Sequence, residues 1–491
     1  MNKWGYNMDI NETFVVNFIR EELIELPNVL NRRLIINNEK INQRDEFFLI
    51  KNYVDDFING NTTNRFLVMP GLRGVGKTTL LYQIYDYLLK EKNIPPKQIL
   101  YISCEDLNNL AECNIRQAID IYLEKEHDSS LLTIDKEIFL LIDESQYDKN
   151  WSLSGKIIYD KSDKIFMIFT GSSALDLEYN ADSARRMVKK LIYPLNYAQY
   201  LKLKYNIEVK NISESLEKLI FTGDVEDAQK YEMELNDKLI NNIDYSSQDW
   251  LEYVKYGGFP TSFNERDKNN ISSKLIDISE KIVNTDMLNI KNITVENQAN
   301  ARRILRFLAL QEPGDVSYQK LSNYLMTSTA NVKNILDILE KTQLIFHCEP
   351  YGGSSKRIKK AWKYYFATSS LHNALASRYG ITIAKSEQFE GVLCENLIAS
   401  TLFNYKNENQ NNYFSLYYDA NKNDNVDFVI KEEFQKPIPI EVGRGKKDKR
   451  QIIGAIKRFN SDYGIIVSNS TDMIKKEDNV IFVPLKTFSF L

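Results

Sequence analysis

Residues 66–81, FLVMPGLRGVGKTTLL, combine residue types and a spacing that suit phosphate binding. A glycine-rich turn can adopt backbone angles closed to residues with a Cβ atom, so that several N–H groups point at one phosphate. The lysine after the turn can reach the outer phosphates of ATP, and the threonine beside it can ligate Mg²⁺. We therefore predict an ATP-binding loop with Mg²⁺, formed by Gly71, Gly74, Gly76, Lys77, Thr78 and Thr79.

The segments around this turn have the order that such a loop requires. Residues 66–68 are apolar and predict a short strand. Apolar residues then recur at helical spacing after the turn, namely Leu80, Leu81, Ile84, Tyr85 and Leu88. A chance glycine turn before a core helix is the alternative, but the strand before the turn and the helix after it favour phosphate binding.

Two further apolar runs end in polar side chains that suit ATP hydrolysis. Residues 138–144, IFLLIDE, predict a buried parallel strand that delivers Asp143 and Glu144 at its carboxyl end, where ligands bind in open α/β sheets. Asp143 is expected to hold Mg²⁺ through water, and Glu144 to orient or deprotonate the attacking water. The next apolar run predicts a strand after which Thr170 or Ser172 is our candidate for sensing the γ-phosphate. An ordinary strand-to-loop turn is the alternative for this last pair.

An arginine pair, Arg185 and Arg186, follows the predicted sensing residues. An arginine aimed at the transferring phosphoryl group stabilises the charge of the transition state, from the same chain or from a neighbouring subunit. Arg186 is our candidate for this catalytic role, and a solvated basic pair is the alternative. The sequence leaves open which chain such an arginine would serve.

The composition is typical of a globular protein with several domains. The 491 residues are 43% hydrophobic and 26% charged, which leads us to expect roughly three or four domains. A net charge of −4 gives no general attraction to nucleic acids or anionic membranes. The four cysteines and three histidines are scattered, which argues against a disulfide framework and a zinc site. We find neither a secretory signal nor 18 consecutive apolar residues, and expect a cytoplasmic protein.

Several motifs occur in an order that identifies a family. They are GLRGVGKTT at 71–79, LLIDE at 140–144, TGSS at 170–173, Arg186 with Pro194-Leu195 after it, YGGFP at 256–260 and KYYFATSSL at 363–371. In this order they resemble a widespread prokaryotic family of AAA-type P-loop ATPases, whose C-terminal domain of long-unknown function looks restriction-endonuclease-like.

The resemblance implies an α/β fold built around the parallel sheet of a P-loop ATPase. Five regions are expected: a helical lead-in at 1–60, the ATPase domain at 61–200, a helical lid or insertion at 201–298, a winged-helix domain at 299–384, and a PD-(D/E)XK nuclease-like α/β domain at 385–491. Residues 205–250 are longer and more charged than the family pattern leads us to expect. They form either a lid or partner-contact surface, or merely a solvated helical pair.

The expected winged helix, three helices and a hairpin, resembles DNA-binding modules. Its hairpin carries a basic cluster with interleaved aromatic residues that could neutralise phosphates, formed by Lys356, Arg357, Lys359, Lys360 and Lys363 beside Trp362, Tyr364 and Tyr365. The third helix lacks a strongly basic outer face, because Asp337 and Glu340 lie among its lysines. Winged helices also mediate protein contacts, so DNA and a protein partner both stay open.

The resemblance also implies a metal site in the C-terminal region. Glu395 on a helix, with Asp427 and Glu441 on adjacent strands, would offer oxygen ligands for Mg²⁺. The expected lysine two residues after Glu441 is missing, because position 443 is glycine. Lys446 or Lys447 could fold back to replace it, or the site is inactive.

Together these features predict a Mg²⁺-dependent ATPase whose nucleotide state is coupled to a nucleic-acid-binding or nuclease-like C-terminal region, in DNA processing or defence. The alternative is a nucleotide-dependent regulatory switch or assembly adaptor with an inactive nuclease-like domain. A homo-oligomer or a protein partner is possible in either case. We expect no membrane partner.

Overall fold

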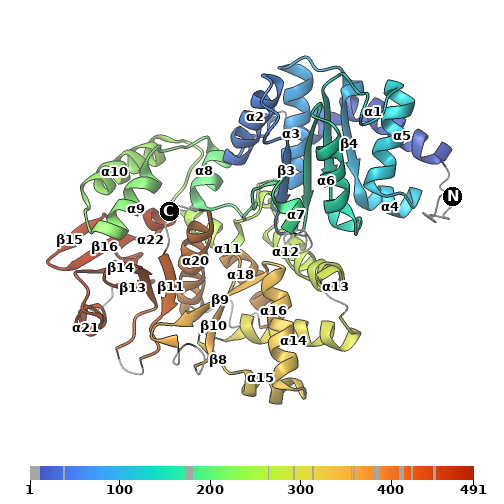
Figure 1. Ribbon diagram of the computed structural model, residues 1–491. Helices are drawn as coiled ribbons and strands as arrows, with labels where there is room; N and C mark the ends of the chain where they lie inside the picture. Colours follow the sequence, from blue (N-terminus) through green and yellow to red (C-terminus); the bar gives the residue numbers. More distant parts are fainter. Residues whose placement is uncertain are drawn as a thin grey trace. The chain divides into compact units, whose positions relative to one another are not determined.

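The computed structural model describes residues 12–36, 39–172, 181–263, 265–290, 293–311, 314–354, 357, 360–380, 387–408, 414–421, 424–445 and 449–491. The chain forms two compact units, residues 1–192 and 193–491 (Figure 1). Each unit has its own sheet.

The sheet of the first unit is parallel, and its strand order is β4-β5-β6-β3-β7. Its strands are β3 (Phe66–Pro70), β4 (Ile99–Ser103), β5 (Ile138–Asp143), β6 (Ile165–Gly171) and β7 (Val188–Lys189). Strands β3, β5 and β6 include the segments that their apolar runs predicted. Parallel strands buried on both faces read as continuous apolar runs, and β5 and β6 are buried along their whole length.

Helices cover both faces of this sheet. One face packs on α1 (Glu12–Leu34), α5 (Ile115–His127) and α6 (Trp151–Lys161). On the other face, α2 (Asp45–Ile58) brings Phe57 within 5.7 Å of the ring of Phe139. The unit also contains α3 (Lys77–Lys90), α4 (Cys104–Ala111), α7 (Ala181–Ala184) and the strand pair β1 (Ile35–Ile36) and β2 (Glu39–Lys40). The predicted helical lead-in and the helix after the glycine turn are therefore present.

The second unit contains a mixed sheet of nine strands, in the order β15-β16-β14-β13-β12-β11-β9-β10-β8 (Figure 1). Their bounds are β8 (Asp315–Val316), β9 (Ile345–Pro350), β10 (Trp362–Phe366), β11 (Phe414–Tyr418), β12 (Phe428–Glu432), β13 (Ile438–Gly443), β14 (Gly464–Ser468), β15 (Lys475–Glu477) and β16 (Val480–Pro484). Strand β9 pairs with β11, so the sheet crosses the boundary that the sequence predicted near residue 385. The hairpin and the C-terminal strands therefore share one sheet.

The helices of this unit begin with α8 (Tyr197–Tyr205), α9 (Ile212–Thr222), α10 (Glu226–Asn241), α11 (Gln248–Tyr256), α12 (Lys268–Lys281) and α13 (Met287–Ile290). Three helices then precede the hairpin as predicted: α14 (Val295–Leu310), α15 (Tyr318–Leu325) and α16 (Thr329–Lys341). The remaining helices are α18 (Ser369–Tyr379), α20 (Glu387–Glu408), α21 (Lys449–Phe459) and α22 (Leu485–Phe488). Strands β15 and β16 and helix α22 were not predicted from the sequence. None of the described helices is long and apolar enough to cross a membrane.

The charged insertion is packed against the C-terminal strands and is not a solvated helical pair. Leu216, Leu219, Leu235 and Leu239 of α9 and α10 are buried in one apolar cluster with residues of the C-terminal sheet. Glu232, which is fully buried, accepts hydrogen bonds from the Ile474 backbone N–H at 2.6 Å and from the Thr487 hydroxyl at 2.5 Å. In the sequence, the many charged residues of these helices obscure the helical spacing of their apolar residues.

Replacing Glu232 with alanine is expected to destabilise the second unit by about 2 to 4 kcal/mol, because two buried hydrogen-bonding groups would lose their partner. The free energy of unfolding in urea measures this loss. Hydrogen exchange of residues 474–488 shows whether the loss occurs at these contacts. Glu234→Ala is the matched control, because Glu234 lies on the same helix and its exposed ion pair with Lys238 is worth at most about 1 kcal/mol. If both variants had the same free energy of unfolding, the prediction would be contradicted.

Candidate nucleotide-binding site

The glycine turn connects β3 to α3, as predicted. Gly74 and Gly76 have φ angles of 80° and 101°, a left-handed conformation that favours glycine. The prediction that Gly71 supplies such an angle is wrong, because its φ is not positive. A Cβ atom at Gly71 would instead lie 2.3 Å from the carbonyl oxygen of Ile192, with which Gly71 forms a β-bridge. Glycine is required there for close backbone approach.

Lys77 begins helix α3, and its side chain is buried in the loop. Its Nζ donates hydrogen bonds to the carbonyl oxygens of Gly71 and Leu72, each at 2.9 Å. Thr78 and Thr79 follow in the first turn of the helix and are half-buried. The ammonium group is thus held inside the loop, where it can reach a bound phosphate.

Asp143 is the polar centre of the site. Its carboxylate accepts hydrogen bonds from the hydroxyls of Thr78 at 2.6 Å and Tyr101 at 3.2 Å, and also from the Thr170 hydroxyl. Burial and the neighbouring charge of Glu144 raise the pKa of Asp143, while the two threonines and Lys77 act in the opposite direction. The loop, β5 and β6 therefore converge on one carboxylate.

The oxygen atoms of this centre fit a magnesium ion. Mg²⁺ prefers oxygen ligands and is commonly held by one or two protein groups together with phosphates and water. The Thr78 hydroxyl and the Asp143 carboxylate, 2.6 Å apart, are the two groups that the sequence predicted for this purpose. When bound, the ion would neutralise charge on the phosphates of ATP.

Glu144, the predicted catalytic base, lies directly after β5 in a left-handed backbone conformation with a φ of 52°. Such a conformation costs free energy for a residue other than glycine, and it occurs often at functional sites. The Gln146 side chain donates a hydrogen bond to the Glu144 carboxylate and accepts one from the Ser172 backbone N–H at 3.1 Å. Gln146 thereby connects the candidate base to the end of β6.

The predicted sensing residues have different environments. Thr170 is fully buried and donates its hydroxyl hydrogen bond to Asp143, which brings it into the site. Ser172 contributes its backbone N–H, whereas Ser173 lies outside the described residues. The role of Thr170 toward a γ-phosphate stays a prediction.

Arg186, the predicted arginine of the transition state, forms an ion pair with Asp160 of α6, with 2.5 Å between Nε and Oδ1. Arg185 is exposed. A surface ion pair of this kind is worth little free energy. Its catalytic role stays a prediction.

Three residues of this site were missed in the sequence. Tyr101 reaches Asp143 from β4, and Gln146 bridges Glu144 and Ser172. Arg44 is buried, forms an ion pair with Glu46 and donates a hydrogen bond to the Val75 carbonyl of the loop at 2.5 Å. Nothing in the sequence of β4 marks the direction of Tyr101. Arg44 carries no local signal of its role at the loop, because the Val75 carbonyl that it contacts lies 31 residues away.

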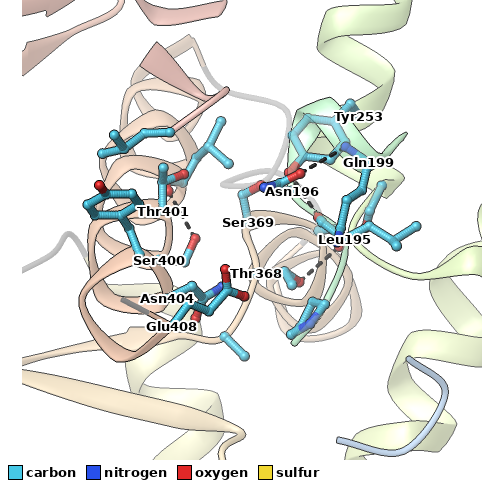
Figure 2. A pocket seen from close by; sticks show the side chains of 18 residues that line it. Leu195, Asn196, Gln199, Tyr253, Thr368, Ser369, Ser400, Thr401, Asn404 and Glu408 are labelled. Carbon is cyan, nitrogen blue, oxygen red and sulfur yellow. Dashed lines mark hydrogen bonds between the residues drawn. The ribbon is translucent and has the colours of Figure 1, made fainter. Parts of the chain in front are cut away.

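The Pro-Leu, YGGFP and ATSSL motifs meet in the second unit (Figure 2). The Leu195 N–H donates to the Gly258 carbonyl at 2.8 Å, and the Tyr253 hydroxyl donates to the Leu195 carbonyl at 3.1 Å. The Ser370 hydroxyl donates to the Gly257 carbonyl. The cavity between them measures about 30 Å³, room for about two water molecules. These motifs therefore have a structural role, because their hydrogen bonds connect three segments of the second unit.

The three C-terminal acids do not come together as the resemblance implied. Among the described residues, no group of three or more His, Cys, Asp or Glu side chains is placed to hold a metal ion. Glu395 instead contacts Lys363 and Tyr365, and the Asp427 carboxylate accepts a hydrogen bond from the Val442 backbone N–H at 2.7 Å. Burial raises the pKa of Glu395 to about 7, although Lys363 acts against this shift.

Part of the predicted basic cluster is used inside the protein. Lys363 is buried, so it is not available to a phosphate of DNA. The Lys360 ammonium donates to the Ala420 carbonyl at 2.7 Å, and Arg357 donates to the Tyr417 hydroxyl at 3.1 Å. The cluster's other two lysines, Lys356 and Lys359, lie outside the described residues, as do the candidate replacements Lys446 and Lys447.

Comparison with known proteins gives three family matches: an AAA domain at residues 63–201, a domain of unknown function (DUF8612) at 247–381, and a domain of unknown function (DUF4143) at 390–488. The uncharacterized protein MJ1637 of Methanocaldococcus jannaschii is 31% identical over 475 residues, which cover 97% of this chain and 94% of that protein. An uncharacterized protein of Haemophilus influenzae is 27% identical, and the match covers 68% of this chain and 75% of that protein.

Among solved structures, the Aeropyrum pernix ORC2 protein is 12% identical. The match covers 72% of this chain and 99% of that one, with a TM-score of 0.34.

Proposed function

Because this chain belongs to the same protein family as MJ1637 of Methanocaldococcus jannaschii and contains an AAA domain, we propose that it is a Mg²⁺-dependent ATPase. The observation that carries the proposal is the convergence of Lys77, Thr78 and Asp143 at the carboxyl edge of a parallel sheet. ATP would bind with its phosphates in the loop between β3 and α3, where the backbone N–H groups and the Lys77 ammonium can contact them.

Each residue of the site then has a defined task. Thr78 and Asp143 hold Mg²⁺, and Glu144 orients the attacking water and accepts its proton. Thr170 and Tyr101 keep the Asp143 carboxylate in place through their hydroxyl groups. Arg186 stabilises the transition state after it leaves Asp160, in its own chain or in a neighbouring one.

We propose further that the ATPase works as a nucleotide-dependent switch or assembly adaptor. Lys363, Lys360 and Arg357 make contacts within the second unit, and this use of the basic hairpin supports a switch or adaptor over DNA binding through the hairpin. A partner would then be bound or released according to the nucleotide state. DNA binding through the helices and hairpin of the second unit is the competing form of the proposal.

The test is phosphate release by the purified full chain with ATP and Mg²⁺, alongside DNA binding measured by fluorescence anisotropy. We expect Mg²⁺-dependent hydrolysis that EDTA abolishes, and DNA affinity that is weak in every nucleotide state. Absence of both ATP binding and hydrolysis would refute the ATPase. Tight DNA binding that depends on nucleotide would replace the adaptor with the DNA-coupled form.

A further inference from the structure

The second unit buries an ion pair between Lys363 of β10 and Glu395 of α20. Lys363 Nζ lies 3.4 Å from Glu395 Oε1, and the Tyr365 hydroxyl donates a hydrogen bond to the same oxygen at 2.8 Å. The centroid of the Tyr418 ring lies 5.6 Å from the ammonium nitrogen, within the range of a cation–π interaction. Lys363 is only 7% exposed. The ammonium group is therefore enclosed by an acid and an aromatic face.

Asp427 is a second acid whose charge acts on this pair. Its negative charge favours the protonated form of Lys363 and disfavours ionisation of Glu395. Glu395 and Asp427 are both half-buried. Two carboxylates in such surroundings repel each other when no cation lies near them, because the protein screens charge less well than water does. Lys363 supplies the compensating positive charge.

The third predicted acid, Glu441, lies on the face of β13 opposite to the one that packs with α20. Side chains alternate along a strand, and Ile440 and Val442 of β13 belong to the same apolar cluster as α20. Glu441 lies between them and is paired in register with Ile466, which belongs to the cluster around α21 on the other face. The described residues therefore do not fit a three-carboxylate metal centre.

We propose that Lys363 is the built-in cation of the Glu395–Asp427 cluster, in the role that the family resemblance implies for a divalent metal ion and for a lysine at position 443. A divalent ion at these two acids would have to displace the ammonium group, which would then be buried without its partner at a large cost. Lys363 is tethered to β10, so the cluster is neutralised as soon as the strand is in place. The C-terminal part of the unit thus folds without a metal ion and does not cleave nucleic acid through these acids.

The experiment is titration calorimetry of the nucleotide-free full chain with Mn²⁺. Every protein carries Asp143→Asn, so that a metal ion at the nucleotide site does not contribute. With Lys363 present, we expect Glu395→Gln and Asp427→Asn to leave the Mn²⁺ isotherm unchanged. Asp427→Asn is also expected to leave DNA incubated with Mn²⁺ as intact as the parent protein does. An isotherm or a cleavage activity that depends on Asp427 or Glu395 in these proteins would overturn the proposal.

Removing the ammonium charge gives the complementary arm. Lys363→Gln is expected to lower the melting temperature and to gain Mn²⁺ binding that Glu395→Gln removes again. Lys360→Gln is the matched control, because Lys360 lies in the same hairpin and contacts a backbone carbonyl, so it should change neither quantity.

The double variant Lys363→Gln/Glu395→Gln keeps the test decisive if the single variant does not fold. With both charges removed, the melting temperature should return toward that of the parent, because neither member of the ion pair is left without the other and Asp427 keeps its hydrogen bond from the Val442 N–H. A double variant that melts no higher than Lys363→Gln would overturn the proposed pairing. These readouts do not involve ATP, so the inference and the ATPase proposal can fail separately.

Discussion

Replacing Glu144 with glutamine is expected to lower kcat for ATP hydrolysis by about 10²- to 10⁴-fold, the usual contribution of a general base. ATP binding should remain, because the loop residues that contact phosphate are unchanged. Glutamine has nearly the shape of glutamate, but its amide cannot accept the proton of the attacking water. Phosphate release and the binding of a fluorescent ATP analogue, measured on the same protein, separate the two effects.

The control for this variant is Glu137→Gln. Glu137 is half-buried just before the amino end of β5, whereas Glu144 follows its carboxyl end, so the control alters a glutamate at the opposite end of the same strand. It should hydrolyse ATP like the parent. A Glu144→Gln protein with a normal kcat would show that Glu144 is not the general base and that another residue has this role.

Replacing Lys77 with alanine is expected to lower hydrolysis by at least about 10²-fold and to weaken ATP binding as well. The lysine provides a positive charge at the outer phosphates in both the ground state and the transition state, and loss of one such group in a buried site typically has this magnitude. Binding should weaken by about 10-fold or more, because a hydrogen bond to a charged group contributes about 1.5 to 3 kcal/mol. Nucleotide titration and phosphate release measure the two quantities.

Lys90→Ala is the matched control for Lys77→Ala. Lys90 ends the same helix, far from the loop in sequence, and its exposed side chain forms an ion pair with the buried Asp86, which also pairs with Lys40. Its removal should leave ATP binding and hydrolysis unchanged. Because Lys77 also donates hydrogen bonds to two loop carbonyls, a melting curve must accompany the experiment. Normal ATP affinity in a stable Lys77→Ala protein would contradict the assignment of the loop.

The segments that the sequence predicted well are those whose signal is local. The apolar run before Asp143, the glycine turn and the spacing of Leu80, Leu81 and Ile84 each lie within a few residues, and β5, the loop and α3 appear where they were expected. The order of elements from α14 to β10 was also correct. Short-range periodicity and turn chemistry are sufficient to specify elements of this kind.

Contacts between distant segments were not predictable in this way. Tyr101, Gln146 and Arg44 join the site through backbone paths that no spacing rule describes. The charge of the insertion left open a lid or partner-contact surface and a solvated helical pair, whereas its apolar residues pack with the C-terminal sheet. Lys363 belongs to the basic cluster that could neutralise phosphates, but the structure buries it beside Glu395.

The sequence by itself was sufficient to predict the candidate nucleotide site, because the chemistry of phosphate and Mg²⁺ demands particular residues at fixed short spacings. It also showed that Gly443 stands where a lysine was expected. Only the tertiary structure decided how the C-terminal acids are used. The pairing of β9 with β11 and the packing of α20 bring Lys363 to Glu395 from a position 32 residues earlier in the chain. Burial of Lys363 then favours that pairing, because a buried ammonium group without a partner costs much free energy.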